Sequence, residues 1–337
     1  MQNISITSGS YQNREVNGTF EVVNAPKAYT ASEHNSGYAK DGFWGYVRVQ
    51  MEGRPRYVHL KETGFLMENH TPIASSINEE VTKADIEELD MRIRRRFQVL
   101  DIMCAGVIRG NVRGLIVSGA AGIGKTFTFE RELVAAQERG EIGNLEHVKG
   151  KLTPLFLFKT LYENRNPGDV VLLDDCDSVF SDETALNILK AALDSSDERW
   201  LTYGSATKWL EENNVESKFL FEGSIIFITN LDFDSMIAAD SKMSPHYSAL
   251  VSRSTYLDLA IHSRLEIMVR VQQIATSTNM MSTLGVDAET ATKIVAFCWE
   301  NYSKMREISI RTLVKIASYV RIAPDQWEML ATELTIA

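Results

Sequence analysis

One stretch of the sequence has the residue types and the spacing of a phosphate-binding loop. Residues 119–126 follow the pattern G-x-x-x-x-G-K-T. Glycines let the backbone curl so that several N–H groups point at a phosphate, and a helix starting there adds the positive end of its dipole. In this pattern Lys125 reaches the terminal phosphates, and the Thr126 hydroxyl contacts Mg²⁺. The predicted nucleotide-binding residues are Gly119, Ala120, Ala121, Gly122, Ile123, Gly124, Lys125, Thr126 and Phe127.

The residues on either side of this loop have the character of a strand and a helix. Residues 115–118 are a short apolar run, and residues 127–137 contain no Pro or Gly and have helix-compatible spacing. A glycine-rich turn with a chance Lys-Thr pair is the alternative. The order of strand, loop and helix favours the phosphate site.

Two adjacent acids follow a second apolar strand at residues 170–173. At the carboxyl end of a parallel strand, Asp174 and Asp175 would face the same crevice as the phosphates. We expect Asp174 to hold the Mg²⁺ shell and Asp175 to orient or deprotonate the attacking water. The alternative is an acidic turn in which Asp175 or Asp177 caps the next helix.

A third apolar run, residues 224–228, ends in Thr229 and Asn230. A neutral amide at that strand end can bind the water or the γ-phosphate without repelling either. We therefore predict that Asn230 belongs to the site, against the alternative of an ordinary turn.

The segments between residues 110 and 228 alternate between strand and helix character, which predicts a parallel sheet covered by helices on both faces. Beyond Ala260 no strand pattern returns, and four helical segments are expected. The predicted domains are an N-terminal region at 1–76, an α/β nucleotide-binding core at 77–260 and an α-helical lid at 261–337.

The N-terminal region gives weaker signals. Residues 1–37 are rich in Ser, Asn, Thr and Gly and are expected to be mostly flexible or irregular, and residues 63–76 resemble a linker. Residues 43–51 and 56–61 alternate as two strands about a Gly/Pro turn, which predicts a hairpin. Its aromatics and arginines could form a face for nucleic acid or a protein partner. The alternative, which we favour, is a small β-element packed on the next domain.

A long helix is predicted at residues 77–108, with apolar residues at three- and four-residue steps. Its opposite face carries Arg92, Arg94, Arg95 and Arg96. We favour a solvated face, and a contact with another subunit or with a phosphate backbone is the alternative.

Composition limits the class of protein. The chain has 337 residues, 44% of them hydrophobic, and a net charge of −10, so any nucleic-acid contact must be local. The three cysteines are far apart and fit a reducing compartment. The sequence shows no signal peptide and no apolar run long enough to span a membrane. We expect a cytoplasmic protein without membrane contact.

The order of these motifs resembles the AAA+ ATPases over about residues 80–325, with Walker A at the loop and Walker B at the paired acids. The resemblance implies a P-loop core with a helical lid, the cofactors ATP and Mg²⁺, and a hydrolytic site in which Asn230 is sensor 1. The sequence also resembles AAA-family ATPases encoded by tailed phages, which would place it in the host cytoplasm.

Two arginines match later motifs of that family. Arg253 stands where the arginine finger is found, with Arg264 as the competitor, and such a finger acts on ATP held by a neighbouring subunit. A homo-oligomer is therefore implied, a hexamer or a similar ring or spiral. Arg311 lies in the first turn of a predicted lid helix, where a cation opposes the helix dipole unless an anion is near. It is similar to sensor 2.

The sequence departs from the family at one catalytic position. Most members have Glu after the Walker B Asp, whereas this chain has Asp175, whose carboxylate is one methylene, about 1.5 Å, further back. We still expect an ATPase, and hydrolysis could be slow.

The substrate of the predicted motor is less defined. Residues 148–154 occupy the position of a loop that faces the central pore of AAA+ rings, and Lys151 and Leu152 are expected to project from it. A DNA-directed motor or loader serving replication or recombination is the preferred prediction. A protein-remodelling or unfolding ATPase and a slow nucleotide-gated assembly switch are the alternatives.

Overall fold

The computed structural model describes residues 3–11, 14–29, 42–51, 54–67, 83–204, 208–239 and 241–337. These residues form two compact units. One unit joins the N-terminal strands to Phe180–Leu186 and Leu231–Ser252, and the other contains the rest of the described chain. The unit with the predicted site is described first.

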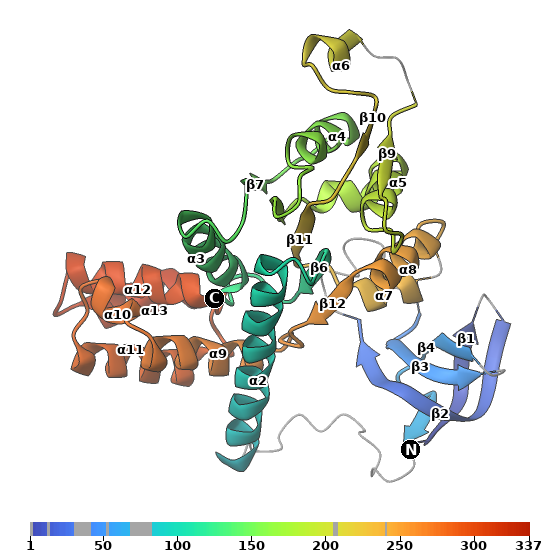
Figure 1. Ribbon diagram of the computed structural model, residues 1–337. Helices are drawn as coiled ribbons and strands as arrows, with labels where there is room; N and C mark the ends of the chain where they lie inside the picture. The colour runs from blue at the N-terminus through green and yellow to red at the C-terminus, as the bar shows by residue number, and fades with distance from the viewer. Residues whose placement is uncertain are drawn as a thin grey trace. The chain divides into compact units, whose positions relative to one another are not determined.

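A five-stranded parallel sheet forms the centre of this unit (Figure 1). Its strands are β6 (Gly114–Ser118), β7 (Leu145–Lys149), β8 (Val170–Asp174), β11 (Ser224–Thr229) and β12 (Thr255–Asp258). They lie in the order β12-β6-β11-β8-β7. The strand before the phosphate loop and the strand before Asp175 therefore flank the strand that ends before Asn230. Because all four pairings are parallel, the three carboxyl ends meet at one edge of the sheet.

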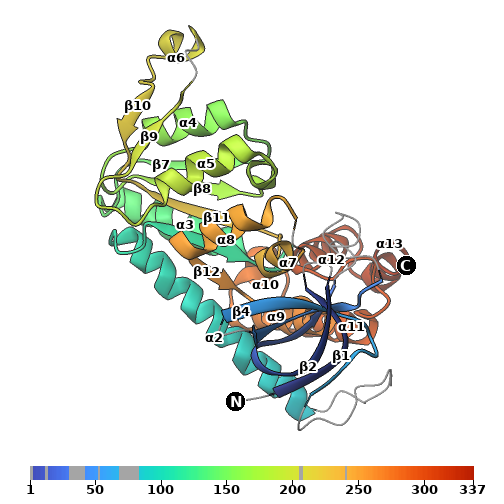
Figure 2. The ribbon, with the colours of Figure 1, turned by 90° about the vertical axis from the view of Figure 1, so that its right-hand side faces the viewer.

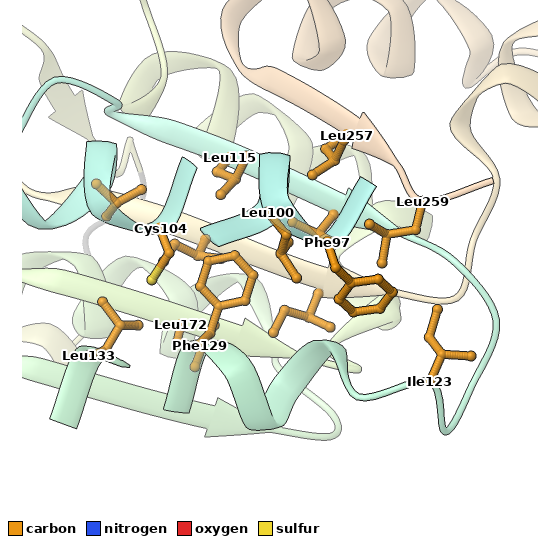
Figure 3. Close-up of a cluster of buried hydrophobic side chains, with 14 of the residues drawn as sticks. Phe97, Leu100, Cys104, Leu115, Ile123, Phe129, Leu133, Leu172, Leu257 and Leu259 are labelled. Atoms are coloured by element: carbon orange, nitrogen blue, oxygen red, sulfur yellow. The ribbon is translucent and has the colours of Figure 1, made fainter. Parts of the chain in front are cut away.

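Helices cover both faces of this sheet, since every residue of β6, β8 and β11 is buried. Two helices, α2 (Lys83–Ile108) and α3 (Lys125–Glu138), cover one face. Figure 3 shows Phe97 and Leu100 of α2 with Phe129 and Leu133 of α3 in one cluster with side chains of the sheet. On the opposite face lie α4 (Pro154–Glu163) and the part of α5 from Asn187 onward (Figure 2). Helices on both faces were predicted, and the prediction is confirmed.

The remaining elements between the core strands are short. Strands β9 (Trp200–Thr202) and β10 (Lys218–Leu220) pair antiparallel, with α6 (Lys208–Glu212) between them. The other helices up to the lid are η1 (Asp177–Ser181), a 3₁₀ helix, α5 (Glu183–Ala192), α7 (Phe233–Ala238) and α8 (Ser244–Arg253).

The C-terminal segment is entirely helical apart from an isolated β-bridge between Met305 and Ile336. Its helices are α9 (Arg264–Ser277), α10 (Met280–Thr283), α11 (Ala288–Asn301), α12 (Ile310–Ile322) and α13 (Trp327–Thr335). They have a core of their own, which includes Met268, Ile294, Leu313 and Trp327. The sequence predicted four of these five helices and missed the one-turn helix α10.

The other unit is built on an antiparallel sheet. Its strands are β1 (Asn3–Tyr11), β2 (Arg14–Ala28), β3 (Gly45–Met51), β4 (Arg54–Leu60) and β5 (Phe65–Met67). They lie in the order β2-β3-β4-β1-β5, and an additional pairing of β2 with β1 closes the sheet on itself. Alternate residues such as Ile4, Ile6, Val47 and Val49 point into its core. The fold is thus α/β, a parallel-sheet core with a helical lid and an N-terminal β-region, as predicted.

The outer face of β3 and β4 packs on α7, which belongs to the same unit. The Tyr46 hydroxyl donates to Asp232 at 3.2 Å, and the Tyr57 hydroxyl donates to Asp234 at 2.8 Å. Lys27 also forms an ion pair with Asp232. This arrangement supports the packing role that we favoured for the hairpin over an open binding face.

Two expectations for the N-terminal region were wrong. Residues 3–11 and 14–28 are paired strands rather than irregular chain, because Ile4, Ile6 and Val16 are buried by partners distant in sequence. The outward positions carry Ser, Thr, Asn and Glu, which gave the segment the composition of a flexible one. The expected linker at 63–76 contains β5, and its residues 68–76 lie outside the described residues. The hairpin of β3 and β4 is confirmed.

Candidate active site

The loop between β6 and α3 has a shape that requires glycine. Gly122 and Gly124 have φ angles of +70° and +96°, which L-residues with a side chain rarely adopt. Gly122 also approaches the lid closely. A Cβ atom on it would lie 2.7 Å from Cβ of Ser309, and its carbonyl accepts a hydrogen bond from the Ile310 N–H at 2.8 Å. The loop therefore contacts the start of α12 directly.

Lys125 lies in the first turn of α3 and is buried. Its Nζ donates to the carbonyls of Gly119 and Ala120, at 2.5 and 2.9 Å, and to Oδ1 of Asn230 at 2.8 Å. Burial lowers the pKa of Lys125 to about 8, although the nearby aspartates act in the opposite direction. A phosphate beside this ammonium would favour its charged form.

Asp174 and Thr126 form the part of the site suited to a metal ion. The Thr126 hydroxyl donates to Oδ1 of the buried Asp174 at 2.9 Å, so a hydroxyl and a carboxylate oxygen converge on one point beside the loop. Mg²⁺ prefers such oxygen ligands and keeps several waters. Among the described residues there is no group of three or more His, Cys, Asp or Glu that could enclose a metal by itself. The pair fits Mg²⁺ held jointly with phosphates and water.

Asn230 bridges the phosphate loop and the second acid. Its Oδ1 accepts from Lys125, and its Nδ2 donates to Oδ1 of Asp175 at 3.0 Å. Asp175 has a left-handed backbone with a φ angle of +52°, and its N–H donates to the carbonyl of Ile228 at 3.0 Å. This conformation turns the chain away from the sheet at Asp175, so its carboxylate is exposed at the sheet edge while that of Asp174 is buried.

A cavity of about 640 Å³ joins these groups to the lid. Three predicted catalytic residues, Asp175, Asn230 and Arg311, line it, and so do most of the predicted nucleotide-binding residues. Those are Ala121, Gly122, Gly124, Lys125, Thr126 and Phe127. In the described part of the chain, Gly119 and Ala120 contribute carbonyls to Lys125 instead, and Ile123 packs in the hydrophobic core.

The two candidates for an arginine finger have different surroundings. Nε of Arg253, at the end of α8, lies 3.4 Å from Oδ1 of Asp194, and both side chains are partly exposed. Arg264 donates to the carbonyls of Tyr302 and Met305 and so ties α9 to the residues that follow α11. Neither is among the described residues that line the cavity of its own chain. Arg264 is thus engaged within the lid, whereas Arg253 has a carboxylate neighbour.

Sequence reasoning missed two charged residues of the cavity, Arg131 of α3 and Arg270 of α9. Arg270 of α9 is buried, and its Nε donates to the carbonyl of Ile123 at 3.2 Å. Its guanidinium lies over the ring of Phe97, 3.3 Å from the centroid, and burial lowers its pKa to about 10. The sequence feature that could have indicated Arg270 is its position as a single Arg between apolar residues of a predicted helix. Periodicity alone does not tell such a residue from one on the solvent face.

The lid contributes a second missed group. Ile274, Thr278, Asn279, Met280, Thr283 and Leu284 line the cavity from the end of α9 through α10. They were missed because α10 is a single turn, too short to show a helical period.

The predicted pore loop before α4 has a different arrangement from the expected one. Leu152 is buried, with an exposed fraction of 3%, and its N–H donates to Oγ of Ser178 at 3.2 Å. The expectation that Leu152 projects from the loop was therefore wrong, because an apolar side chain there is stabilised by packing inward. Lys151 is exposed, as expected, and Thr153 caps α4 by accepting the N–H of Phe156.

The arginines of α2 are largely engaged within the unit. Arg92 pairs with Glu266, Arg94 with Asp90, and Arg96 donates to the carbonyl of Asp258 at 3.0 Å. Arg92 and Arg96 thus connect α2 to other elements, and Arg94 forms an ion pair within α2. Arg92, Arg94 and Arg95 are nevertheless exposed, as the favoured prediction of a solvated face expects, and Arg96 is half-buried.

The strand order, the glycine-rich loop and the C-terminal helices together define the class: an α/β protein with a five-stranded parallel sheet, a loop of phosphate-binding pattern and a helical lid. The chain is 36% identical over 332 residues to a 36.7 kDa protein of Enterobacteria phage T4, encoded in the nrdC-mobD intergenic region and described as uncharacterized. That alignment covers 98% of each chain. The chain belongs to the family of this phage protein.

Solved structures give more distant similarities. Domain III of the replication initiation protein DnaA from Thermotoga maritima has a TM-score of 0.44 at 12% identity, covering 78% of this chain and 99% of that one. NtrX from Brucella abortus in complex with ATP has a TM-score of 0.44 at 15% identity, covering 75% of this chain and 53% of NtrX. No protein-family model matches the chain. None of the helices in the described ranges is both long and apolar enough to cross a bilayer.

Proposed function

We propose that this protein is an ATPase that binds and hydrolyses Mg²⁺–ATP in the cavity between the phosphate loop and the lid. The observation that carries the proposal is the connected group Lys125–Asn230–Asp175, with Thr126 and Asp174 beside it, at the edge where β6, β11 and β8 end. A phosphate loop alone binds phosphates. The addition of paired acids and a polarising amide supplies the groups that hydrolysis requires.

Each residue has a role that its position supports. Loop N–H groups and Lys125 bind the phosphates, and Thr126 and Asp174 hold Mg²⁺, which supplies charge neutralisation at the phosphate oxygens. Asp175 accepts a proton from, or orients, the attacking water. Asn230 keeps Asp175 in place through its Nδ2 and binds Lys125 through its Oδ1. Arg311 faces the same cavity from the lid.

Completion of the site by a second subunit is part of the proposal. Arg253 lies outside the described lining of the cavity in its own chain, and its guanidinium is partly exposed. A guanidinium from a neighbouring copy would neutralise charge on the transferring phosphoryl group, an effect of about 10³–10⁵ in rate. We infer a homo-oligomeric ring or spiral, and the phage relative supports the host cytoplasm as its location.

DNA is the proposed substrate of the motor. Lys151 is exposed at the loop before α4 whereas Leu152 is buried, so this loop offers a cation to a phosphate backbone and no apolar grip for a polypeptide. This observation favours a DNA-directed step in replication or recombination over protein unfolding. A protein partner of the N-terminal region remains part of the proposal.

A slow nucleotide-gated switch is a second candidate because of Asp175. Its shorter carboxylate is hydrogen-bonded to Asn230, and its backbone is fixed in a left-handed conformation. Both features limit how far the carboxylate can reach towards a water. Steady-state turnover distinguishes the two candidates, since a switch would bind ATP and assemble with little turnover.

The test is ATP binding, turnover and assembly state for the full chain and for Lys125→Ala, with and without single- and double-stranded DNA. We expect the wild type to bind and hydrolyse ATP and Lys125→Ala to lose binding. DNA is expected to stimulate turnover at low salt and to lose this effect at high salt. Absence of ATP binding by the wild type would refute the ATPase. ATP hydrolysis that neither form of DNA alters would refute the DNA-directed step alone.

A further inference from the structure

His147 lies beside the proposed metal site but is absent from every motif in the sequence. It belongs to β7, which pairs in parallel with β8 so that Lys149 is opposite Asp174 and His147 is opposite Leu172. Residues two apart on a strand share a face. His147, Lys149 and Asp174 therefore point to the same side of the sheet, which is the side covered by α3.

The two ring nitrogens of His147 face two different carboxylates. Nε2 lies 3.5 Å from Oδ2 of Asp174, and Nδ1 lies 3.6 Å from Oε1 of Glu130. Glu130 is four residues after Thr126 on α3, so both side chains are on the same helix face. The imidazole is thereby held between the helix that carries Thr126 and the strand that carries Asp174.

Nε2 of His147 is buried and has no hydrogen-bond partner within the described residues. Buried polar nitrogens nearly always have a hydrogen-bond partner. The candidate acceptor for Nε2 is Oδ2 of Asp174. The distance of 3.5 Å is a few tenths of an ångström beyond an ordinary hydrogen bond. A small rotation of the Asp174 carboxylate would close it.

The two oxygens of Asp174 therefore have separate neighbours. Oδ1 accepts the Thr126 hydroxyl at 2.9 Å, and Oδ2 faces His147, with Nζ of Lys149 at 4.0 Å. When Thr126 and Asp174 both direct lone pairs at a cation, their mutual hydrogen bond is lost. The contact on Oδ2 then determines how the carboxylate is oriented.

We propose that His147 is a positioning residue for the metal-binding carboxylate: its Nε2–H holds Oδ2 of Asp174 so that Oδ1 faces the metal and its waters. Hydrogen-bonding partners of metal ligands typically change metal affinity by about 10–100-fold when removed. This inference rests on the proposed function, because it assumes Mg²⁺–nucleotide binding at the phosphate loop.

The test compares His147→Leu with His147→Gln in the full chain. Gln places an amide N–H near the position of Nε2, whereas Leu fills the space without a donor. His262→Leu is a matched control, because its Nε2 also lies close to an aspartate, 3.4 Å from Oδ2 of Asp258. Three quantities are measured: ATP affinity in EDTA, Mn²⁺ affinity of the protein–ADP complex by electron paramagnetic resonance, and the Mg²⁺ concentration for half-maximal turnover.

We expect His147→Leu to bind ATP in EDTA like the wild type, to bind Mn²⁺ about 10-fold more weakly and to need about 10-fold more Mg²⁺. His147→Gln should recover most of both metal effects, and His262→Leu should match the wild type. Wild-type Mn²⁺ affinity in His147→Leu overturns the proposal. Equal defects in the Leu and Gln variants, or a loss of ATP binding in EDTA, overturn it in favour of a purely structural role. A wild type that binds neither ATP nor Mn²⁺–ADP refutes the proposed function instead.

Discussion

Replacement of Gly122 by Ala tests whether the phosphate loop and the lid must approach each other closely. Gly122 has a φ angle of +70°, and a Cβ atom on it would meet Cβ of the buried Ser309 at 2.7 Å. Carbon atoms in contact prefer about 3.5–4.0 Å, so the start of α12 must move by about 1 Å. That movement strains the hydrogen bond from Ile310 to the carbonyl of Gly122.

Gly140→Ala is a matched control for the backbone effect. Gly140 has nearly the same φ angle, +71°, and no described atom lies within 4 Å of a Cβ placed on it. A left-handed conformation costs an L-residue about 1–2 kcal/mol, which both variants share. Overpacking adds about 1–3 kcal/mol in Gly122→Ala alone. The expected losses of stability are therefore about 1–2 kcal/mol for Gly140→Ala and about 2–5 kcal/mol for Gly122→Ala.

The assay combines unfolding with nucleotide binding. Denaturant unfolding gives the two free energies, and binding of a fluorescent ATP analogue gives the affinities. We expect Gly140→Ala to bind ATP like the wild type and Gly122→Ala to bind at least about tenfold more weakly, since 1.4 kcal/mol is a factor of ten. Equal ATP affinity and equal stability in the two variants would refute the claim that the approach to Ser309 matters.

Two further predictions concern Lys125 and Arg253. Burial lowers the pKa of Lys125 to about 8, so ATP affinity should fall as the pH rises above about 8. ATP binding at pH 8 should also take up protons, because the phosphates favour the charged lysine. Calorimetry in buffers of different ionisation enthalpy measures this proton uptake, and Lys125→Arg should abolish it. Between about pH 8 and the ordinary lysine pKa of 10.5, Lys125 is less protonated in the folded chain than in the unfolded chain. Its burial therefore lowers the free energy of unfolding by a constant amount below pH 8, and this loss of stability disappears as the pH rises from about 8 to 10.5. Arg253→Ala should bind ATP normally and turn over about 10³-fold more slowly or worse, and mixing it with Lys125→Ala should restore some turnover if subunits share sites. Full turnover by Arg253→Ala alone would contradict its assignment as the finger.

The sequence predicted the parts of the site that depend on local patterns. The loop from Gly119 to Thr126, the acids after β8 and Asn230 after β11 were all found because each follows an apolar strand, and parallel strands bring such ends to one edge. Lid helices α9, α11, α12 and α13 were found from their periodicity. These signals lie within about fifteen neighbouring residues, which is the range that pattern reasoning covers.

The missed features depend on contacts between distant residues. His147 and Arg270 belong to elements that were predicted, but their neighbours Asp174 and Ile123 come from other parts of the chain. The strands β1 and β2 were not predicted for a related reason. Few of their residues are apolar and point inward, and these residues are buried only by partner strands from other parts of the sequence. Leu152 shows the same limit, because only packing decides whether an apolar loop residue faces inward.

The contacts between α2 and α9 have a mechanical consequence for the lid. Arg92 pairs with Glu266, Arg94 donates to Ser277 at 3.4 Å, and Gln273 donates to the carbonyl of Asp90 at 2.8 Å. A hinge requires a connection with few contacts across it. These bonds instead join α2 to α9 from the first turn of α9 to its last residue. Any swinging of the lid about the connection before α9 must therefore break these bonds, because α9 also packs in the core of the lid. Because the Arg92–Glu266 pair is partly exposed, the stiffness of this brace decreases as ionic strength rises.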